Sequence, residues 1–416
     1  MDYIKGFSDR KYGLLGEHLS HSFSPQIHAS MADYPYDLYE VERENLGSWV
    51  KSCGLSGYNV TIPYKHEIIK YCDTLSPAAQ KIGAVNTVKV LSDGSLLGDN
   101  TDYYGFRYMV EALNLDLRGK KAIVLGNGGA SKTVQVVLSE EGAEVVVFDL
   151  AGENRYSDLG LHTDAVLIVN ATPVGMYPNT GVSLADLSMF TECKGVLDLI
   201  YNPAHTALLQ QAEHLGIPCM NGLSMLVAQA KRACEIFTDI TLSDSVIESI
   251  RRDVSAQTEN LILVGMPGCG KTTIGTLLAQ KLGRKFMDAD EEILSSTGRT
   301  PSRIIKEDGE AAFRLVESQV LRDICKQSGL IIATGGGAVT VSENYDVLRQ
   351  NGKVIFLQRN IDILATDDRP LSVNLPQLYE KRLPMYREFS HAEVDGNCTP
   401  EEAAERVYRA FSEAIV

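Results

Sequence analysis

Short apolar runs alternate with amphipathic helical patterns along most of the chain. The runs are bounded by glycine, proline or polar residues, which is typical of strands that lie in the middle of a sheet. The expected strands are Lys121–Leu125, Glu144–Phe148, Ala165–Asn170, Gly195–Ile200, Leu261–Val264, Leu330–Ala333 and Lys353–Leu357. Because helical patterns separate these strands, the sequence predicts an α/β fold with mainly parallel sheets.

A polar run, RRDVSAQTEN, interrupts this alternation at residues 251–260. It separates an expected amphipathic helix, Ile236–Ile250, from the strand Leu261–Val264. A chain of 416 residues is also too long for one ordinary core. We therefore predict a first domain at 1–252, a linker at 253–259 and a second domain at 260–416.

Composition excludes several classes of protein. The formal net charge is -15 and neither half of the chain is basic, so nucleic acid is a poor partner. The apolar runs are far shorter than a membrane helix, and the N-terminal residues MDYIKGFSDRKYG carry charges where a signal peptide is apolar. The eight cysteines form no CxxC pair, which argues against a zinc site or a disulfide framework. We expect a cytoplasmic protein without membrane partners, and its oligomeric state stays open.

The sharpest motif is GMPGCGKT, which follows the expected strand Leu261–Val264 and opens an expected helix, Lys271–Leu282. It fits the GxxxxGK[ST] pattern, in which glycines let backbone N–H groups close around phosphate oxygens. Lys271 would reach the β- and γ-phosphates, and the Thr272 hydroxyl would ligate Mg²⁺. A plain glycine turn is the alternative. The expected ATP-binding positions are Gly265, Gly268, Cys269, Gly270, Lys271, Thr272 and Thr273.

Further motifs follow in order: FMDAD at 286–290, AAFR at 311–314, ATGGG at 333–337, RPL at 369–371 and KRLPMY at 381–386. With the glycine-rich motif, they make residues 260–416 resemble shikimate kinase. The resemblance implies that Asp288 helps to hold Mg²⁺ and that Asp290 binds the substrate hydroxyls. It implies shikimate carboxylate contacts for Arg314 and Arg382, substrate-loop roles for Gly335, Gly336 and Gly337, and a phosphate-contacting lid arginine at Arg369.

Two of these residues have simpler alternatives, since Arg314 could form only a helix ion pair with Glu317, and Asp290 could only cap a helix. The expected lid also departs from the family. Shikimate kinases usually carry a further arginine upstream of RPL that packs on the adenine, whereas residues 363–382 are short and acidic here. We therefore expect weak ATP binding with the phosphate chemistry retained.

The first domain contains HSFSP at 21–25, NVTIPYK at 59–65, AVNT at 84–87, GDNTD at 98–102 and GLSMLVAQA at 222–230. This ordered set resembles shikimate dehydrogenase, which implies a substrate lobe at about 1–105 and 226–252. A Rossmann-like dinucleotide lobe would occupy about 106–225. By the resemblance, Lys65 and Asp102 form the catalytic pair; a surface ion pair is the alternative. The substrate-binding positions implied are Ser22, Ser24, Asn59, Thr61, Asn86, Asp102 and Gln229, with Tyr201 a weaker candidate.

The dinucleotide site is expected at the turn GNGGAS, between the strand Lys121–Leu125 and an expected helix, Lys132–Glu141. Its expected contacts are Gly126, Gly128, Gly129, Ala130 and Asp149. An acidic residue at the end of the next strand suits the ribose 2′-hydroxyl of NAD. Shikimate dehydrogenases commonly place Asn-Arg-Thr there for the 2′-phosphate of NADP. We expect NADP with NAD not excluded, and Arg155 is a candidate phosphate contact.

Both resemblances together imply a bifunctional enzyme of aromatic amino acid biosynthesis. The first domain would reduce 3-dehydroshikimate to shikimate, and the second would phosphorylate shikimate with ATP and Mg²⁺. A non-catalytic quinate- or shikimate-responsive regulator is one alternative, against which intact Lys65, Asp102, Lys271 and Asp290 argue. A dehydrogenase that also accepts quinate is another.

Overall fold

The computed structural model describes residues 2–19, 22–364 and 375–415. The chain divides into two compact units. The first comprises Met1–Val174, Ser183–Tyr201 and Gln211–Arg251, and the second comprises Gly175–Val182, Asn202–Gln210 and Arg252–Val416. In both, the predicted α/β architecture is confirmed.

The residues around the predicted linker are helical. The helix expected at 236–250 is instead the end of α7 (Leu223–Thr238) and the start of α8 (Ser245–Thr258). Asp239 ends α7 in a left-handed conformation, with a φ of 58°. Helix α8 then continues through 253–258 because Val254 stays buried one turn after Ile250. Residues 253–258 of the predicted linker are therefore helical, and the division between the two units falls inside this helix, between Arg251 and Arg252.

The first sheet of the first unit is mixed. Its six strands run in the order β2-β1-β3-β5-β6-β4. Strand β1 pairs in parallel with β2 and β3, whereas β5 pairs antiparallel with β3 and β6. The elements are β1 (Tyr12–Gly16), α1 (Ser24–Ala29), β2 (Tyr36–Glu40), α2 (Leu46–Ser52), β3 (Gly57–Val60), β4 (Thr74–Leu75), α3 (Pro77–Ile82), β5 (Thr87–Val90) and β6 (Leu96–Asp99).

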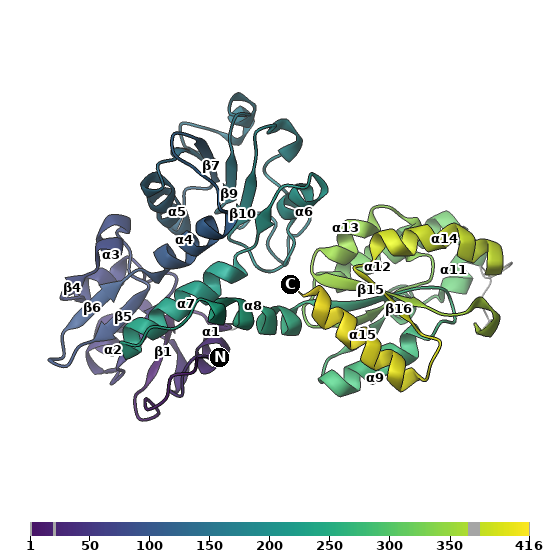
Figure 1. The fold of residues 1–416 in the computed structure, drawn as a ribbon, viewed down its shortest axis with the longest axis horizontal. Helices are drawn as coiled ribbons and strands as arrows, with labels where there is room; N and C mark the ends of the chain where they lie inside the picture. The colour runs from purple at the N-terminus through teal and green to yellow at the C-terminus, as the bar shows by residue number, and fades with distance from the viewer. Residues whose placement is uncertain (1, 20–21, 365–374, 416) are drawn as a thin grey trace. The chain divides into compact units, whose positions relative to one another are not determined.

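The second sheet of this unit is parallel throughout, in the order β11-β10-β9-β7-β8. Its strands are β7 (Lys121–Leu125), β8 (Glu144–Phe148), β9 (Leu167–Asn170), β10 (Gly195–Asp198) and β11 (Cys219–Met220). Its helices are α4 (Thr101–Leu113) and α5 (Gly129–Glu140), and the division between the units falls within α6 (Ala207–His214). Figure 1 shows α4 and α7 side by side between the two sheets. Strands β7 and β8 match their predicted bounds.

The second unit is a three-layer α/β domain around a parallel sheet of order β13-β14-β12-β15-β16. Helices α9 and α15 cover one face of this sheet, and α12 and α13 cover the other (Figure 1). The strands are β12 (Asn260–Val264), β13 (Phe286–Asp288), β14 (Ile331–Ala333), β15 (Gly352–Gln358) and β16 (Ala392–Asp395). The helices are α9 (Lys271–Leu282), α10 (Ala289–Thr297), α11 (Pro301–Asp308), α12 (Glu310–Cys325), α13 (Asn344–Arg349), α14 (Leu375–Phe389) and α15 (Pro400–Ala414).

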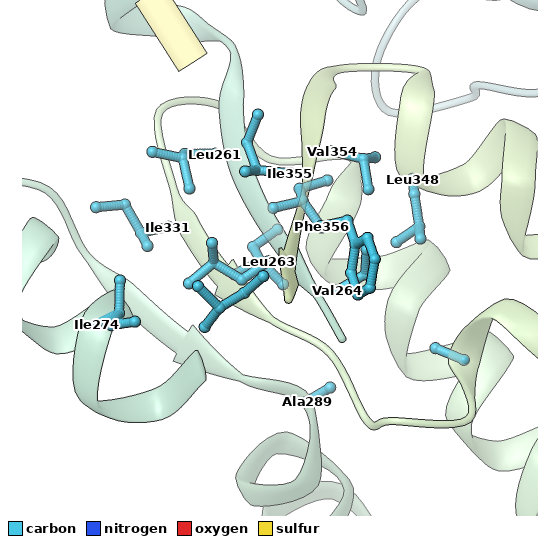
Figure 2. Close-up of a cluster of buried hydrophobic side chains, with 14 of the residues drawn as sticks. Leu261, Leu263, Val264, Ile274, Ala289, Ile331, Leu348, Val354, Ile355 and Phe356 are labelled. Atoms are coloured by element: carbon cyan, nitrogen blue, oxygen red, sulfur yellow. The ribbon is translucent and has the colours of Figure 1, made fainter. Parts of the chain in front are cut away.

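The core of the second unit forms on both faces of its central strand. All five residues of β12 are buried, which is why this strand reads as a continuous apolar run rather than an alternating one. In Figure 2, Leu263 and Val264 of β12 lie near Ile355 and Phe356 of the neighbouring β15, with Ile274 of α9 among the surrounding side chains. In the described part of the chain, every helix is too short or too polar to cross a membrane.

A glycine at the start of α7 allows the helix to approach strand β10 closely. A methyl group built on Gly222 would lie 2.0 Å from the carbonyl oxygen of Leu199, a backbone atom that cannot rotate away. We expect Gly222→Ala to lower the free energy of unfolding of the first unit by about 1–3 kcal/mol, the usual cost of overpacking. Urea unfolding followed by the fluorescence of Trp49, the single tryptophan, reports this unit alone.

Gly160→Ala is the matched control, because a methyl group there would meet no atom within 4 Å. If the two variants unfold at the same urea concentration, the close approach of α7 to Leu199 does not determine the stability of the first unit.

Candidate active sites

The first unit encloses a cavity of about 480 Å³ where strand ends of its two sheets meet α4 and α7. The structure brings the predicted catalytic and substrate-binding residues of the dehydrogenase together there, with Ala130 of the dinucleotide turn, whereas Gly126, Gly128, Gly129 and Asp149 do not line this cavity. Those that line it are Ser22, Ser24, Asn59, Thr61, Lys65, Asn86, Asp102, Ala130, Tyr201 and Gln229. His21 of the HSFSP motif lies outside the described residues.

Lys65 and Asp102 form an ion pair in the wall of this cavity. The Lys65 ammonium donates to Oδ2 of Asp102 at 2.6 Å, and the two side chains are 30% and 16% exposed. Asp102 lies in the first turn of α4, where the helix dipole stabilises a carboxylate. This placement favours a functional pair over the surface ion pair that we kept as the alternative.

Asn59 and Asn86 belong to a hydrogen-bond network beneath the cavity. The Asn59 amide donates to Thr87 Oγ1 at 2.9 Å, and its carbonyl oxygen accepts from the Tyr36 hydroxyl at 2.7 Å. Oδ1 of Asn86 accepts from the backbone N–H of Thr101 at 2.6 Å. These bonds fix the orientation of both amides before any substrate arrives.

A neutral histidine packs against Tyr36, which belongs to this network. His28 is buried, stacks on the Tyr36 ring at 4.0 Å and contacts the Tyr34 hydroxyl through Nδ1 at 2.7 Å. Burial lowers the pKa of His28 to about 3, so the imidazole is uncharged at neutral pH. Sequence analysis missed Tyr36 and His28, because their role depends on a stacking contact across elements and on no local motif.

The predicted dinucleotide turn joins β7 to α5. Gly126 has a φ of 99°, and a methyl group on it would meet the Thr172 side chain at 2.6 Å, so both its conformation and its surroundings require glycine. Gly128 and Gly129 face open space on their Cα atoms. The N-terminus of α5 is therefore accessible to a phosphate group.

The loop after β8 carries both candidate ribose residues. Asp149 follows the strand, and its carboxylate accepts from the N–H of Leu150 at 2.6 Å. The chain then turns back, so that Asn154 pairs with Phe148 and its amide donates to the carbonyl of Val147 at 3.2 Å. Exposed Arg155 thus emerges beside the end of β8, next to Asp149.

The second unit encloses a cavity of about 460 Å³ around the glycine-rich loop. Gly265, Gly268 and Gly270 have φ values of 151°, 81° and 102°, which L side chains rarely adopt. The Lys271 ammonium donates to the carbonyl oxygens of Gly265 and Met266 at 2.9 and 3.0 Å. Gly268, Gly270, Lys271, Thr272 and Thr273 line the cavity, whereas the Cys269 side chain is buried in the core.

Thr272 and Asp288 meet at the mouth of the loop. The Thr272 hydroxyl donates to Oδ2 of Asp288 at 2.7 Å, and Oδ1 of Asp288 accepts from the N–H of Asp290 at 3.0 Å. Asp288, and not Asp290, is therefore the cap of α10. Asp290 lines the cavity, which removes the simple capping alternative for it.

Two arginines converge on the substrate-loop glycines. Arg314 pairs with Glu317 at 2.7 Å and with Glu310 at 3.0 Å, and a methyl group on Gly337 would lie 2.1 Å from its Nη2. Arg382 donates to the carbonyl oxygen of Gly336 at 3.1 Å. The Glu317 side chain is fully buried, and this burial raises its pKa, although Arg314 opposes the shift. Five of these residues line the cavity: Arg314, Glu317, Gly336, Gly337 and Arg382.

The remaining residues are those of the expected lid and those that line the cavity without having been predicted as site residues. Arg369 and most of the expected lid lie outside the described residues. The structure adds Arg359 to the cavity, together with Ser302, Ile305 and Phe313. Phe313 belongs to the AAFR motif, whereas Arg359, Ser302 and Ile305 belong to no motif that sequence analysis used.

Comparison with known proteins assigns both parts of the chain. A family model described as shikimate kinase matches residues 267–412, and one described as the shikimate dehydrogenase substrate binding domain matches residues 14–88. A shikimate dehydrogenase (NADP(+)) of Clostridium beijerinckii is 36% identical over 259 residues, spanning 58% of this chain and 96% of that protein.

Solved structures agree for the first part. A Thermus thermophilus shikimate 5-dehydrogenase in complex with NADP(H) and shikimate is 32% identical, with a TM-score of 0.54 over 59% of this chain and 99% of that one. A Listeria monocytogenes shikimate 5-dehydrogenase in complex with shikimate and NAD is 30% identical, with a TM-score of 0.53 over 60% and 98%.

The buried His28 makes stability depend on pH. Its pKa is about 3 in the folded chain against 6.5 for an unperturbed histidine, so the folded state binds fewer protons between these values. The stability it contributes is complete above pH 6.5 and is lost as the pH falls toward 3. Between pH 7 and pH 5, we expect His28 to account for a loss of about 2 kcal/mol in the free energy of unfolding.

His28→Gln should remove this part of the pH dependence, measured by urea unfolding with Trp49 fluorescence at both pH values. Exposed His66, changed to Gln, is the control and should keep the wild-type profile. Identical pH profiles for wild type and His28→Gln would show that the imidazole is not held neutral by the fold.

Proposed function

Because this chain belongs to the shikimate dehydrogenase family and continues into a shikimate kinase domain, we propose that it catalyses two consecutive reactions on one substrate skeleton. The first unit reduces 3-dehydroshikimate to shikimate with NADPH. The second transfers the γ-phosphoryl group of ATP to the 3-hydroxyl of shikimate. The observation that carries the proposal is the presence of two separate cavities, each lined by the residues that its own reaction needs.

In the dehydrogenase cavity, Lys65 is the proton donor. Its ammonium, 2.6 Å from Asp102, passes a proton to the carbonyl oxygen of the substrate as that oxygen gains charge. Asp102 holds the ammonium in place, and Ser22 and Ser24 offer hydroxyl donors to the substrate carboxylate. NADPH supplies the hydride when bound at the N-terminus of α5.

Arg155 is the residue that favours NADP. It emerges next to the end of β8, where a 2′-phosphate would need a cation, while the Asp149 carboxylate already accepts the N–H of Leu150. An arginine presents a planar, fully charged donor group to a phosphate. The negative charge of Asp149 still opposes the phosphate, so we propose NADP with a weaker preference than a site without this carboxylate would have.

In the kinase cavity, the protein positions two anions. Backbone N–H groups of the glycine-rich loop and Lys271 hold the phosphates, and Arg314 and Arg382 hold the shikimate carboxylate. Asp290 accepts the proton of the 3-hydroxyl as the bond between its oxygen and the γ-phosphorus forms and the bond to the β-phosphate oxygen breaks. The oxygens of Thr272 and Asp288 suit Mg²⁺, which would neutralise charge on the phosphates.

Separate cavities predict separable activities. Lys65→Met should lower the rate of 3-dehydroshikimate reduction by about 10²- to 10⁴-fold and leave phosphorylation of shikimate within a few-fold of wild type. Lys271→Met should do the reverse. Both rates are measured on each purified full-length variant.

Lys70→Met and Lys326→Met remove the same charge outside the two cavities and serve as controls. If a change in one cavity silenced both activities in a folded protein, the model of two independent sites would be wrong.

The ribose site predicts opposite effects for two substitutions. Arg155→Met should lower kcat/KM for NADPH by about tenfold or more and change kcat/KM for NADH much less, because only NADPH carries the 2′-phosphate. Asp149→Asn should shift the preference toward NADPH.

Arg118→Met, with a side chain that is 85% exposed, controls for the loss of one positive charge. An unchanged NADPH to NADH ratio in both ribose-site variants would show that neither residue faces the cofactor.

A further inference from the structure

Arg359 lines the kinase cavity although it belongs to none of the sequence motifs. It follows β15, which pairs in parallel with β12 so that Phe356 lies opposite Val264. Both strands therefore end at the same edge of the sheet, where β12 continues into the glycine-rich loop and β15 continues into Arg359. A methyl group on Gly270 would lie 3.5 Å from Nη1 of Arg359, so the guanidinium lies against this loop.

The Arg359 guanidinium carries an unpaired donor. Its Nε is buried and has no hydrogen-bond partner among the described residues. Leaving a buried donor without a partner is unfavourable, and we expect such a group to serve a ligand. Arg359 also lines the cavity, which gives that ligand a place.

The other charged side chains of the cavity are carboxylates, cations with protein partners, or the lysine of the glycine-rich motif. Three carboxylates line it: Asp288, Asp290 and Glu317. Of the cations, Arg314 is paired with Glu317 and Glu310, and Arg382 donates to the substrate loop. Lys271 is the cation of the glycine-rich motif itself. A triphosphate therefore meets a cavity in which Arg359 is the remaining guanidinium beside the phosphate loop, among the described residues.

We propose that Arg359 binds the β- and γ-phosphates of the nucleotide. This inference rests on the proposed kinase function and adds a residue to it. The expected lid is short and lacks the arginine that packs on the adenine, so a cation supplied from the end of β15 replaces part of the lost binding energy. Arg359 contacts the phosphate chain rather than the base, because its guanidinium lies against Gly270, the residue that caps the N-terminus of α9, where anions bind.

The test is direct binding of nucleotide to the full-length protein by calorimetry, without shikimate. Arg359→Met should raise the Kd for ATP by roughly ten- to hundredfold, the range expected for losing a charge-assisted hydrogen bond. The effect should be smaller for ADP and nearly absent for AMP, which has no β- or γ-phosphate. Inorganic tripolyphosphate should compete with ATP less effectively in Arg359→Met than in wild type.

Arg409→Met is the matched control, since Arg409 is an exposed residue of α15 outside the cavity. Its Kd for ATP should match wild type, and unliganded melting curves should show that both variants are folded. Equal Kd values for Arg359→Met and Arg409→Met would overturn the inference, as would an equal loss for AMP and ATP. If wild type binds no ATP at all, the proposed kinase function fails instead.

Discussion

The parallel pairing of the central strand β12 with β14 and β15 is the constraint on which the kinase site depends. The register sets Leu263 opposite Ala333 and Val264 opposite Phe356. Three loops therefore begin at the same level: the glycine-rich loop, the loop of Gly335–Gly337 and the segment that starts with Arg359. A slip of one residue in either pairing would turn every following side chain to the other face of the sheet.

The same constraint acts in the dinucleotide-binding sheet. Strand β7 pairs with β8 and β9, and this pairing brings Gly126 next to the end of β8, where its N–H donates to the carbonyl oxygen of Phe148 at 2.8 Å. The return of Asn154 to Phe148 extends that edge by one more pairing. In both sheets, the buried pairing is fixed by apolar side chains, and the polar residues at the strand ends are positioned by it.

The parts of the fold that were predictable are those in which local pattern and tertiary environment agree. The strand Lys121–Leu125 and the helix Lys271–Leu282 were predicted to the residue, because an apolar run ends at a glycine in one and a glycine opens the other. The helical conformation of residues 253–258 was missed, since Val254 is the only large apolar residue in the run RRDVSAQTEN. Likewise, the positions of Tyr36 and Arg359 depend on pairing between strands that are distant in the sequence. Sequence motifs alone could not predict these positions.

One chain carries both cavities, and the described residues that line each cavity belong to a single unit. Every molecule that is synthesised therefore brings one dehydrogenase site and one kinase site, in a fixed ratio that neither transcription nor translation can change. Two separate proteins could be balanced by their abundance. Here the balance between the two activities must be set by the side chains that line each cavity, so a substitution in either cavity changes their relative capacity.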